Sequence, residues 1–202
     1  MIIGILALQG AVREHTISLN RVAIEARKVK TEQDLEGLDG LILPGGESTA
    51  ISLLANDSFL SRLRELAVSG FPMFGTCAGM ILLASGVEGR DSGYIGGIDV
   101  SVSRNASGRQ VDSFETVLDI EDIGSDVPAV FIRAPYITRY GSTVRPMANY
   151  NGQCVMAREA NILVASFHPE LTEDTRIHEY FVGMVSKRKN PKGGIEHEES
   201  GD

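Results

Sequence analysis

The N-terminal half of the chain alternates between short apolar runs and segments with apolar positions at helical spacing. The apolar runs predict parallel strands, because a strand that is buried on both faces shows no polar alternation. These strands are predicted at residues 2–8, 26–30, 40–43 and 72–75. The intervening segments predict helices at residues 12–24, 47–55 and 78–84, and one more with its N-cap at Ser58. This order favours a parallel sheet with helices on both faces.

From about Ile95 the pattern changes to strand-like stretches that follow one another without clear helices. They include residues 100–102, 111–118, 130–133, 143–148 and 154–158. We expect these stretches to extend the same sheet, partly in antiparallel orientation. A last buried strand at 162–167 and a helix at 175–185 complete a predicted α/β fold with an open, mostly parallel sheet.

The sequence predicts a single domain over residues 1–186, followed by a polar tail at 187–202. The tail has basic residues first and acidic residues last, and it has almost nothing to bury. We expect this tail to be disordered.

Charge and cysteine content narrow the possible functions. The chain has 202 residues and a formal net charge of -8, which argues against a nucleic-acid partner. Its two cysteines, Cys77 and Cys154, are too few for a disulfide framework and favour a reducing, cytoplasmic setting. They have no zinc-type spacing, so no metal site is expected.

Two apolar segments could be mistaken for targeting or membrane segments. Residues 1–10 lack the basic start and the small-residue cleavage site of a signal peptide, and they are interpreted as a buried strand. Residues 68–87 carry no charge, but glycines and Pro72 interrupt them. A strand, a tight turn and a short helix explain this segment better than a membrane span.

Cys77 is the strongest candidate nucleophile. It lies between an apolar strand and a helical stretch, with Gly75 and Gly79 beside it, as in a nucleophile elbow. The small neighbours leave room for a strained backbone, and the start of a helix favours a thiolate. The backbone N–H of Ala78 is expected to help stabilise an oxyanion. Cys154 has no such context and is interpreted as a structural residue.

His168 and Glu170 are the candidate base and its orienting carboxylate. They follow the last predicted strand, and Pro169 is expected to keep the segment extended so that the two side chains share a side. A base oriented by a carboxylate completes a triad around Cys77. The other three histidines lack such a partner and are interpreted as surface or packing residues: His15, His178 and His197.

A third element is the string Pro44-Gly45-Gly46-Glu47-Ser48, which also follows a predicted strand. Two glycines before a helix expose free backbone N–H groups. These groups could form the other half of an oxyanion hole at Gly46, or they could hold a carboxylate.

Together these elements resemble the class I, or triad, glutamine amidotransferases, and more narrowly the glutaminase subunits of pyridoxal 5'-phosphate synthase. The resemblance runs from Gly4 to about Val185. The strings that carry it are Ala7–His15, Leu43–Thr49, Gly75–Met80, Gly108–Glu115, Phe131–Pro135 and Ser166–Thr172. One departure is Ser107, where the family usually has an aromatic residue.

The resemblance implies a flavodoxin-like, three-layer fold and the hydrolysis of L-glutamine through a glutamyl thioester. It implies that Cys77 is the nucleophile, that His168 transfers protons and that Glu170 holds His168. It also implies glutamine contacts at Gly46, Glu47, Ser48, Arg104, Ile132 and Arg133. The ammonia would pass to a synthase subunit in a hetero-oligomeric complex, and the chain itself would need no cofactor.

Three alternatives remain open at this stage. The chain could serve another amidotransferase, for histidine, purine or anthranilate synthesis, although the Gln9 and Phe-Ile-Arg-Ala-Pro strings count against this. It could be a binding or chaperone-like protein with Cys77 as a redox sensor, because a fold does not fix a function. A cysteine protease is the third alternative.

Overall fold

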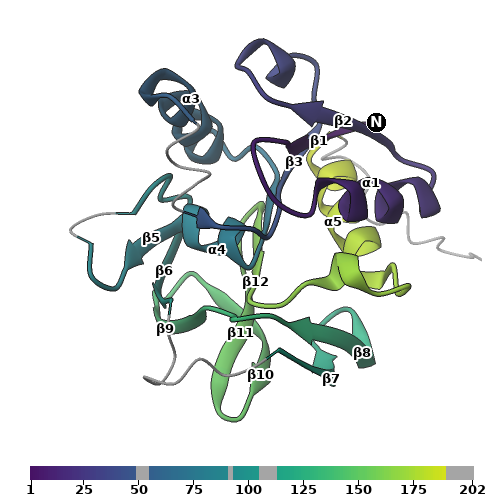
Figure 1. Cartoon of the computed structure of the whole chain (residues 1–202), viewed down its shortest axis with the longest axis vertical. Helices are drawn as coiled ribbons and strands as arrows, with labels where there is room; N and C mark the ends of the chain where they lie inside the picture. Colours follow the sequence, from purple (N-terminus) through teal and green to yellow (C-terminus); the bar gives the residue numbers. More distant parts are fainter. Residues whose placement is uncertain (49–54, 91–92, 105–112, 190–202) are drawn as a thin grey trace, which may run out of the picture.

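A computed structural model describes residues 1–48, 55–90, 93–104 and 113–189 of the chain (Figure 1). Apart from the helix predicted at 47–55, most of which lies outside the described residues, the predicted elements of the N-terminal half are present with small changes at their ends. The strands are β1 (Ile2–Leu6), β2 (Glu25–Val29), β3 (Gly40–Leu43), β4 (Met73–Thr76) and β5 (Ala84–Val87). The helices are α1 (Val12–Arg21), the 3-10 turn η1 (Gln33–Leu35), α3 (Asp57–Val68) and α4 (Ala78–Leu83).

The second half of the described chain contains most of the antiparallel structure. Its strands are β6 (Ile98–Ser103), β7 (Phe114–Ile120), β8 (Gly124–Phe131), β9 (Tyr136–Tyr140), β10 (Arg145–Tyr150), β11 (Gln153–Glu159) and β12 (Ile162–Ala165). The 3-10 turn η2 (Pro169–Leu171) and helix α5 (Arg176–Lys189) follow.

The main sheet has the strand order β2-β1-β3-β4-β12-β11-β9-β6-β5, and β10 pairs with β11. The first five strands in this order, β2, β1, β3, β4 and β12, are parallel to one another. The next strand, β11, runs antiparallel to both of its neighbours β12 and β9. The predicted mostly parallel sheet with an antiparallel extension is therefore confirmed. The prediction is wrong for β7 and β8, which form a separate two-stranded sheet.

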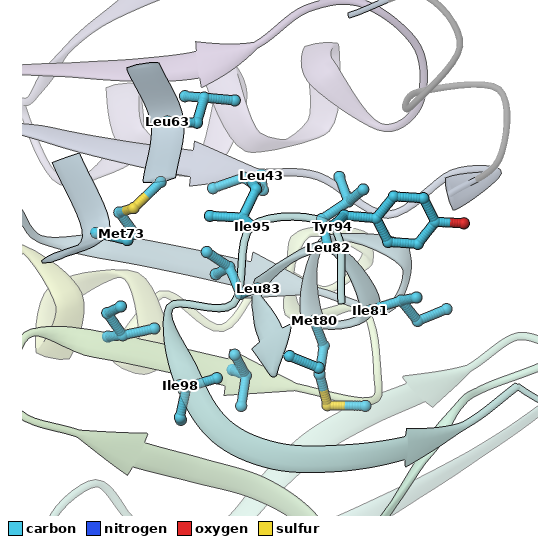
Figure 2. Packing of buried hydrophobic residues seen from close by; sticks show 14 of the residues in the cluster. Leu43, Leu63, Met73, Met80, Ile81, Leu82, Leu83, Tyr94, Ile95 and Ile98 are labelled. Atoms are coloured by element: carbon cyan, nitrogen blue, oxygen red, sulfur yellow. The ribbon is translucent and has the colours of Figure 1, made fainter. Parts of the chain in front are cut away.

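Alternate residues of the central strands enter two separate hydrophobic clusters, one on each face of the sheet. Leu41 and Leu43 pack with α3 and α4, whereas Ile42 between them packs with α1 and α5. Figure 2 shows part of the first cluster, where Leu63 of α3 lies beside Leu43 of β3, and Met80 and Leu83 of α4 belong to the same cluster. Burial on both faces explains why these strands are continuous apolar runs.

Two helix boundaries differ from the predictions, at the start of α3 and at the end of α5. Helix α3 has its N-cap at Asn56 instead of Ser58, because the Asn56 side chain accepts a hydrogen bond from the Phe59 N–H at 2.8 Å. Helix α5 continues to Lys189, so residues 187–189 of the expected tail are helical. The predicted helix at 47–55 lies mostly outside the described residues, as does the tail from 190.

The uncharged segment 68–87 forms the end of α3, then β4, α4 and β5, as the strand–turn–helix prediction requires. Among the described residues, no helix is both long and apolar enough to cross a membrane.

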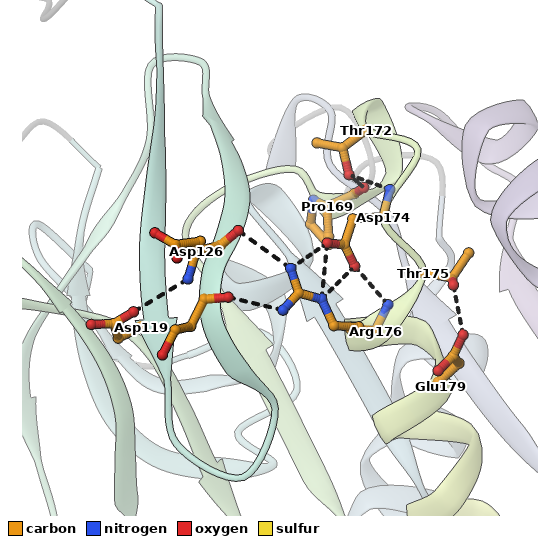
Figure 3. Close-up of polar contacts among 9 residues, drawn as sticks. Asp119, Asp126, Pro169, Thr172, Asp174, Thr175, Arg176 and Glu179 are labelled. Carbon is orange, nitrogen blue, oxygen red and sulfur yellow. Dashed lines mark hydrogen bonds and ion pairs between the residues drawn. The ribbon is translucent and has the colours of Figure 1, made fainter.

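The β7–β8 hairpin is tied to the C-terminal part of the chain by Arg176 (Figure 3). The Arg176 guanidinium donates to the backbone oxygens of Ser125 and Asp126 at 2.9 and 3.3 Å, and to the carboxylate of Asp174. At the other end of the hairpin, the Val130 oxygen accepts from the N–H of His168 at 2.8 Å. The hairpin therefore supports the segment that contains the candidate base.

Candidate active site

Three adjacent parallel strands bring the predicted elements together. β3, β4 and β12 are neighbours in the sheet, and their carboxyl ends lead directly into Pro44-Gly45-Gly46, Cys77 and His168. The candidate nucleophile, base and glycine loop therefore lie at one edge, where open parallel sheets place their ligand sites.

Cys77 adopts the strained backbone expected of a nucleophile elbow. Its φ is 48° and its ψ is -105°, a conformation that few non-glycine residues adopt. A Cβ on Gly75 would lie 2.5 Å from the Gly79 backbone, and one on Gly79 would lie 1.9 Å from the Leu43 oxygen. Only glycine fits at these two positions, because the turn packs directly against β3 and its own helix.

His168 and Glu170 are joined by a hydrogen bond of 2.8 Å between Nδ1 and Oε1. The prediction of an extended segment is wrong here, because Pro169–Leu171 forms the 3-10 turn η2. His168 itself stays outside the turn, with φ -111° and ψ 84°, as the following proline requires. The turn folds the carboxylate back under the imidazole, so the pair forms by a different geometry from the one expected.

The imidazole of His168 is held in its charged form. Burial lowers its pKa, but hydrogen bonds to Cys77 and Glu170, with the charges of those two groups, outweigh burial and raise the pKa to about 10. Burial acts to raise the pKa of Glu170, but electrostatic interactions with His15 and His168 and the hydrogen bond to His168 keep it below the ordinary value. The arrangement can therefore present a protonated imidazole beside a sulfur at neutral pH.

The glycine loop is fixed by the segment that follows β1. The Gly45 oxygen accepts from the Ala11 N–H at 3.0 Å, and the Gln9 Oε1 accepts from the Glu47 N–H at 2.7 Å. On the other side, a Cβ on Gly45 would lie 2.2 Å from Cε1 of His168. Gln9 thus positions the loop, a role that sequence reasoning missed because a glutamine after a strand carries no distinctive pattern.

His15 and His178 are packing residues, as one of the two expected roles requires, but the expectation that His15 lacks a carboxylate partner is wrong. Both side chains are fully buried, and the Nε2 of His15 lies 3.6 Å from the Oε2 of Glu170. His15 also contacts Thr76 Oγ1 at 3.2 Å and His178 Nε2 at 3.0 Å. Nothing local in the sequence indicated that the carboxylate partner of His15 is 155 residues away. His197 lies outside the described residues.

The predicted glutamine-binding residues differ in their exposure and in their contacts. Ile132 contacts the nucleophile, since its backbone oxygen lies 4.0 Å from the Cys77 Sγ. Arg133 next to it is exposed and has a positive φ of 44°. Arg104 follows β6, and its guanidinium donates to the hydroxyl of Tyr94. Ser48 is buried, whereas Gly46 and Glu47 are exposed at the same edge. Ser107 lies outside the described residues.

Comparisons with known proteins agree with this geometry. Residues 5–187 match the SNO glutamine amidotransferase family. The chain is 49% identical to pyridoxal 5'-phosphate synthase subunit PdxT of Brevibacillus brevis, over 94% of this chain and 100% of the relative. It is 50% identical to the subunit of the same name from Carboxydothermus hydrogenoformans, over 93% of this chain and 99% of the relative.

Solved structures show the same fold. A crystal structure of a glutamine amidotransferase superposes with a TM-score of 0.87 at 44% identity, covering 92% of this chain and 100% of the other. PurLQS from Thermotoga maritima superposes with a TM-score of 0.69 at 14% identity, covering 91% and 98%. The second likeness concerns the fold alone.

Proposed function

Because the chain belongs to the SNO glutamine amidotransferase family, we propose that it is the glutaminase subunit of a pyridoxal 5'-phosphate synthase. It hydrolyses L-glutamine to L-glutamate and supplies the ammonia to a synthase subunit. The single observation that carries the chemistry is the buried His168–Glu170 pair beside the strained Cys77. A redox sensor would need neither this pair nor the glycine loop.

In the first half of the reaction the sulfur of Cys77 attacks the side-chain carbonyl carbon of glutamine. The carbonyl oxygen takes the negative charge, and the backbone N–H groups of Gly46 and Ala78 stabilise it. His168 then gives its proton to the departing nitrogen, and the carbon–nitrogen bond breaks. Ammonia leaves, and a glutamyl thioester remains on Cys77.

In the second half His168 takes a proton from water, and the oxygen of that water attacks the thioester carbon. The carbon–sulfur bond breaks, glutamate leaves and the sulfur is regenerated. Glu170 holds His168 in one orientation throughout and stabilises its charge. The pKa of about 10 keeps His168 protonated before attack, so the acid for the first half is ready when glutamine binds.

Recognition of glutamine is assigned to residues around the same edge. The guanidinium groups of Arg104 and Arg133 suit the α-carboxylate, because arginine forms charge-assisted hydrogen bonds with carboxylates. Gly46, Glu47, Ser48 and Ile132 complete the proposed substrate contacts. Ile132 has the strongest support, since its backbone lies beside the sulfur.

We assign the hydrolysis to a single catalytic domain that begins at β1 and ends with α5 at Lys189. A reducing, cytoplasmic compartment suits a catalytic thiol, and both Cys77 and Cys154 are free. We expect the isolated chain to have low activity. Dependence on the synthase would prevent hydrolysis of glutamine when no partner is present to use the ammonia.

The test is glutamate release from glutamine by the full chain, alone and with a pyridoxal 5'-phosphate synthase subunit. We expect release to rise when the synthase is added. Release that is equally fast without the synthase would contradict the dependence on the partner. No release under either condition would contradict the glutaminase itself.

A further inference from the structure

One oxygen of Glu170 is left without a hydrogen bond. Oε1 accepts from His168, but Oε2 is buried and has no hydrogen-bond partner among the residues that the structure describes. A buried carboxylate oxygen without a donor is costly, because burial removes the water that would solvate its charge. A nitrogen lies near it, the Nε2 of His15 at 3.6 Å.

His15 is placed at this oxygen by three elements that pack together. It comes from α1, contacts Thr76 of β4 through Nε2 and contacts His178 of α5 through Nδ1. The rings of Phe74 and His178 pack around it with centroids at 6.3 and 5.3 Å. Because His15 is fully buried, its ring has one set of neighbours, and its proton has a defined place.

The neighbours decide which nitrogen of His15 carries the proton. With the proton on Nδ1, the lone pair of Nε2 would face the carboxylate, and His178 would carry a buried N–H on an Nδ1 that has no described partner. With the proton on Nε2, it points toward Glu170 and Thr76, and the Nε2–H of His178 donates to Nδ1 of His15. Unmatched buried N–H groups are rarer than unmatched acceptors, so the second arrangement is favoured.

We propose that His15 is a positioning residue for the hydrolysis, which stabilises the second oxygen of Glu170 electrostatically through its Nε2–H at 3.6 Å and is itself fixed by His178. This inference rests on the proposed glutaminase function. It extends the triad into the interior as a chain of side chains from Cys77 through His168 and Glu170 to His15 and His178.

His15 also contacts the glycine loop indirectly, through Thr76. The hydroxyl oxygen of Thr76 accepts from the Gly45 N–H at 3.0 Å, and Gly45 packs against the ring of His168. His15 therefore braces the glycine loop as well as the carboxylate. Since the base lies between these two groups, loss of His15 lets it turn away from the sulfur.

The experiment compares His15→Leu, which removes the donor, with His15→Gln, whose amide N–H reaches near the position of Nε2. The matched control is Leu19→Ala, which creates a cavity one turn further along the same buried helix face without removing a hydrogen-bonding group. We expect His15→Leu to lower kcat about 10- to 100-fold with unchanged KM for glutamine, as expected when a catalytic group is misplaced. His15→Gln should recover most of this loss, and Leu19→Ala should lower the melting temperature with little change in kcat.

Equal losses of kcat in the Leu and Gln variants would overturn the proposal, because a donor at this position would then make no difference. So would a normal kcat in His15→Leu. Two further measurements need no turnover. Nitrogen NMR of the wild-type chain should find the His15 proton on Nε2, and a proton on Nδ1 would overturn the assignment. Alkylation of Cys77 by iodoacetamide should be slower in His15→Leu than in Leu19→Ala, and equal rates would count against the proposal.

These outcomes separate the two proposals. If the wild-type chain with its synthase releases no glutamate, the proposed function fails, while the tautomer and the alkylation rates still test His15. If the wild type releases glutamate and His15→Leu does so equally well, the role of His15 fails alone.

Discussion

Two histidines flank Glu170, and their surroundings shift their pKa values in opposite directions. His168 lies on the side of Cys77, where the thiol and the carboxylate raise its pKa to about 10. His15 lies on the interior side, where burial lowers its pKa although Glu170 opposes this. One ring is a cation that can give a proton, and the other is a neutral ring that can hold a position. The difference teaches that hydrogen-bond partners, not proximity to a carboxylate alone, decide the charge of a buried histidine.

The largest expected effect tests the catalytic side of this comparison. Cys77→Ala removes the nucleophile and should lower glutamate release by at least about 10⁴-fold, as loss of a triad nucleophile does elsewhere. Cys154→Ala is the matched control, because burial raises the pKa of Cys154 to about 11 and keeps that thiol neutral. Steady-state assays and thermal unfolding of both variants give the answer. Turnover that survives in Cys77→Ala would rule out the thioester mechanism.

The next largest effect is expected from removing the negative charge of Glu170, which lies between the two histidines. Glu170→Gln keeps the shape of the side chain but loses the carboxylate, so His168 should become less basic and kcat should fall about 10²- to 10⁴-fold. Its control is Glu173→Gln, since the Glu173 side chain is 95% exposed. A pH profile of Cys77 alkylation reports the change in His168. An unchanged profile in Glu170→Gln would contradict the role given to the carboxylate.

A smaller effect is expected from a substitution that crowds the ring of His168. Gly45→Ala places a methyl group 2.2 Å from Cε1 of His168, so the ring or the loop must move. We expect kcat to fall about 10- to 100-fold, the loss expected of a displacement near 1 Å. Gly183→Ala in α5 is the control, because a Cβ there meets nothing within 4 Å. If kcat in Gly45→Ala equals that of the control, the loop does not fix the base.

The smallest effect concerns stability on the interior side. Burial lowers the pKa of His178 to about 3, so below pH 6.5 the unfolded chain takes up a proton that the folded chain does not. This contribution to stability is present above pH 6.5 and is lost as the pH falls toward 3, with a slope of at most about 1.4 kcal/mol per pH unit. Urea unfolding of wild type and His178→Phe between pH 7 and pH 4 measures it. A slope that is the same in the two proteins would contradict a neutral, buried His178.

Local patterns were sufficient for the parallel half of the fold. The runs at β1, β3, β4 and β12 are buried on both faces, so their apolar character is visible without any partner. They were not sufficient for β7 and β8, because a half-exposed strand shows the same alternation in any sheet it joins. The hairpin packs on the main sheet and is tied to α5 by Arg176, but its strands pair only with each other, which the pattern of alternation does not show.

The sequence by itself determined where the chemistry lies. The glycines around Cys77, the glycine loop and the His-Pro-Glu string each follow a predicted strand, and parallel strands bring their ends together. Only the tertiary structure decided how His168 meets Glu170 through a 3-10 turn, and that His15 and His178 lie behind them. For His15 and His178 the physical reason is distance along the chain. Contacts between residues that are adjacent in space but remote in sequence leave no periodic pattern, whereas burial and turn geometry do.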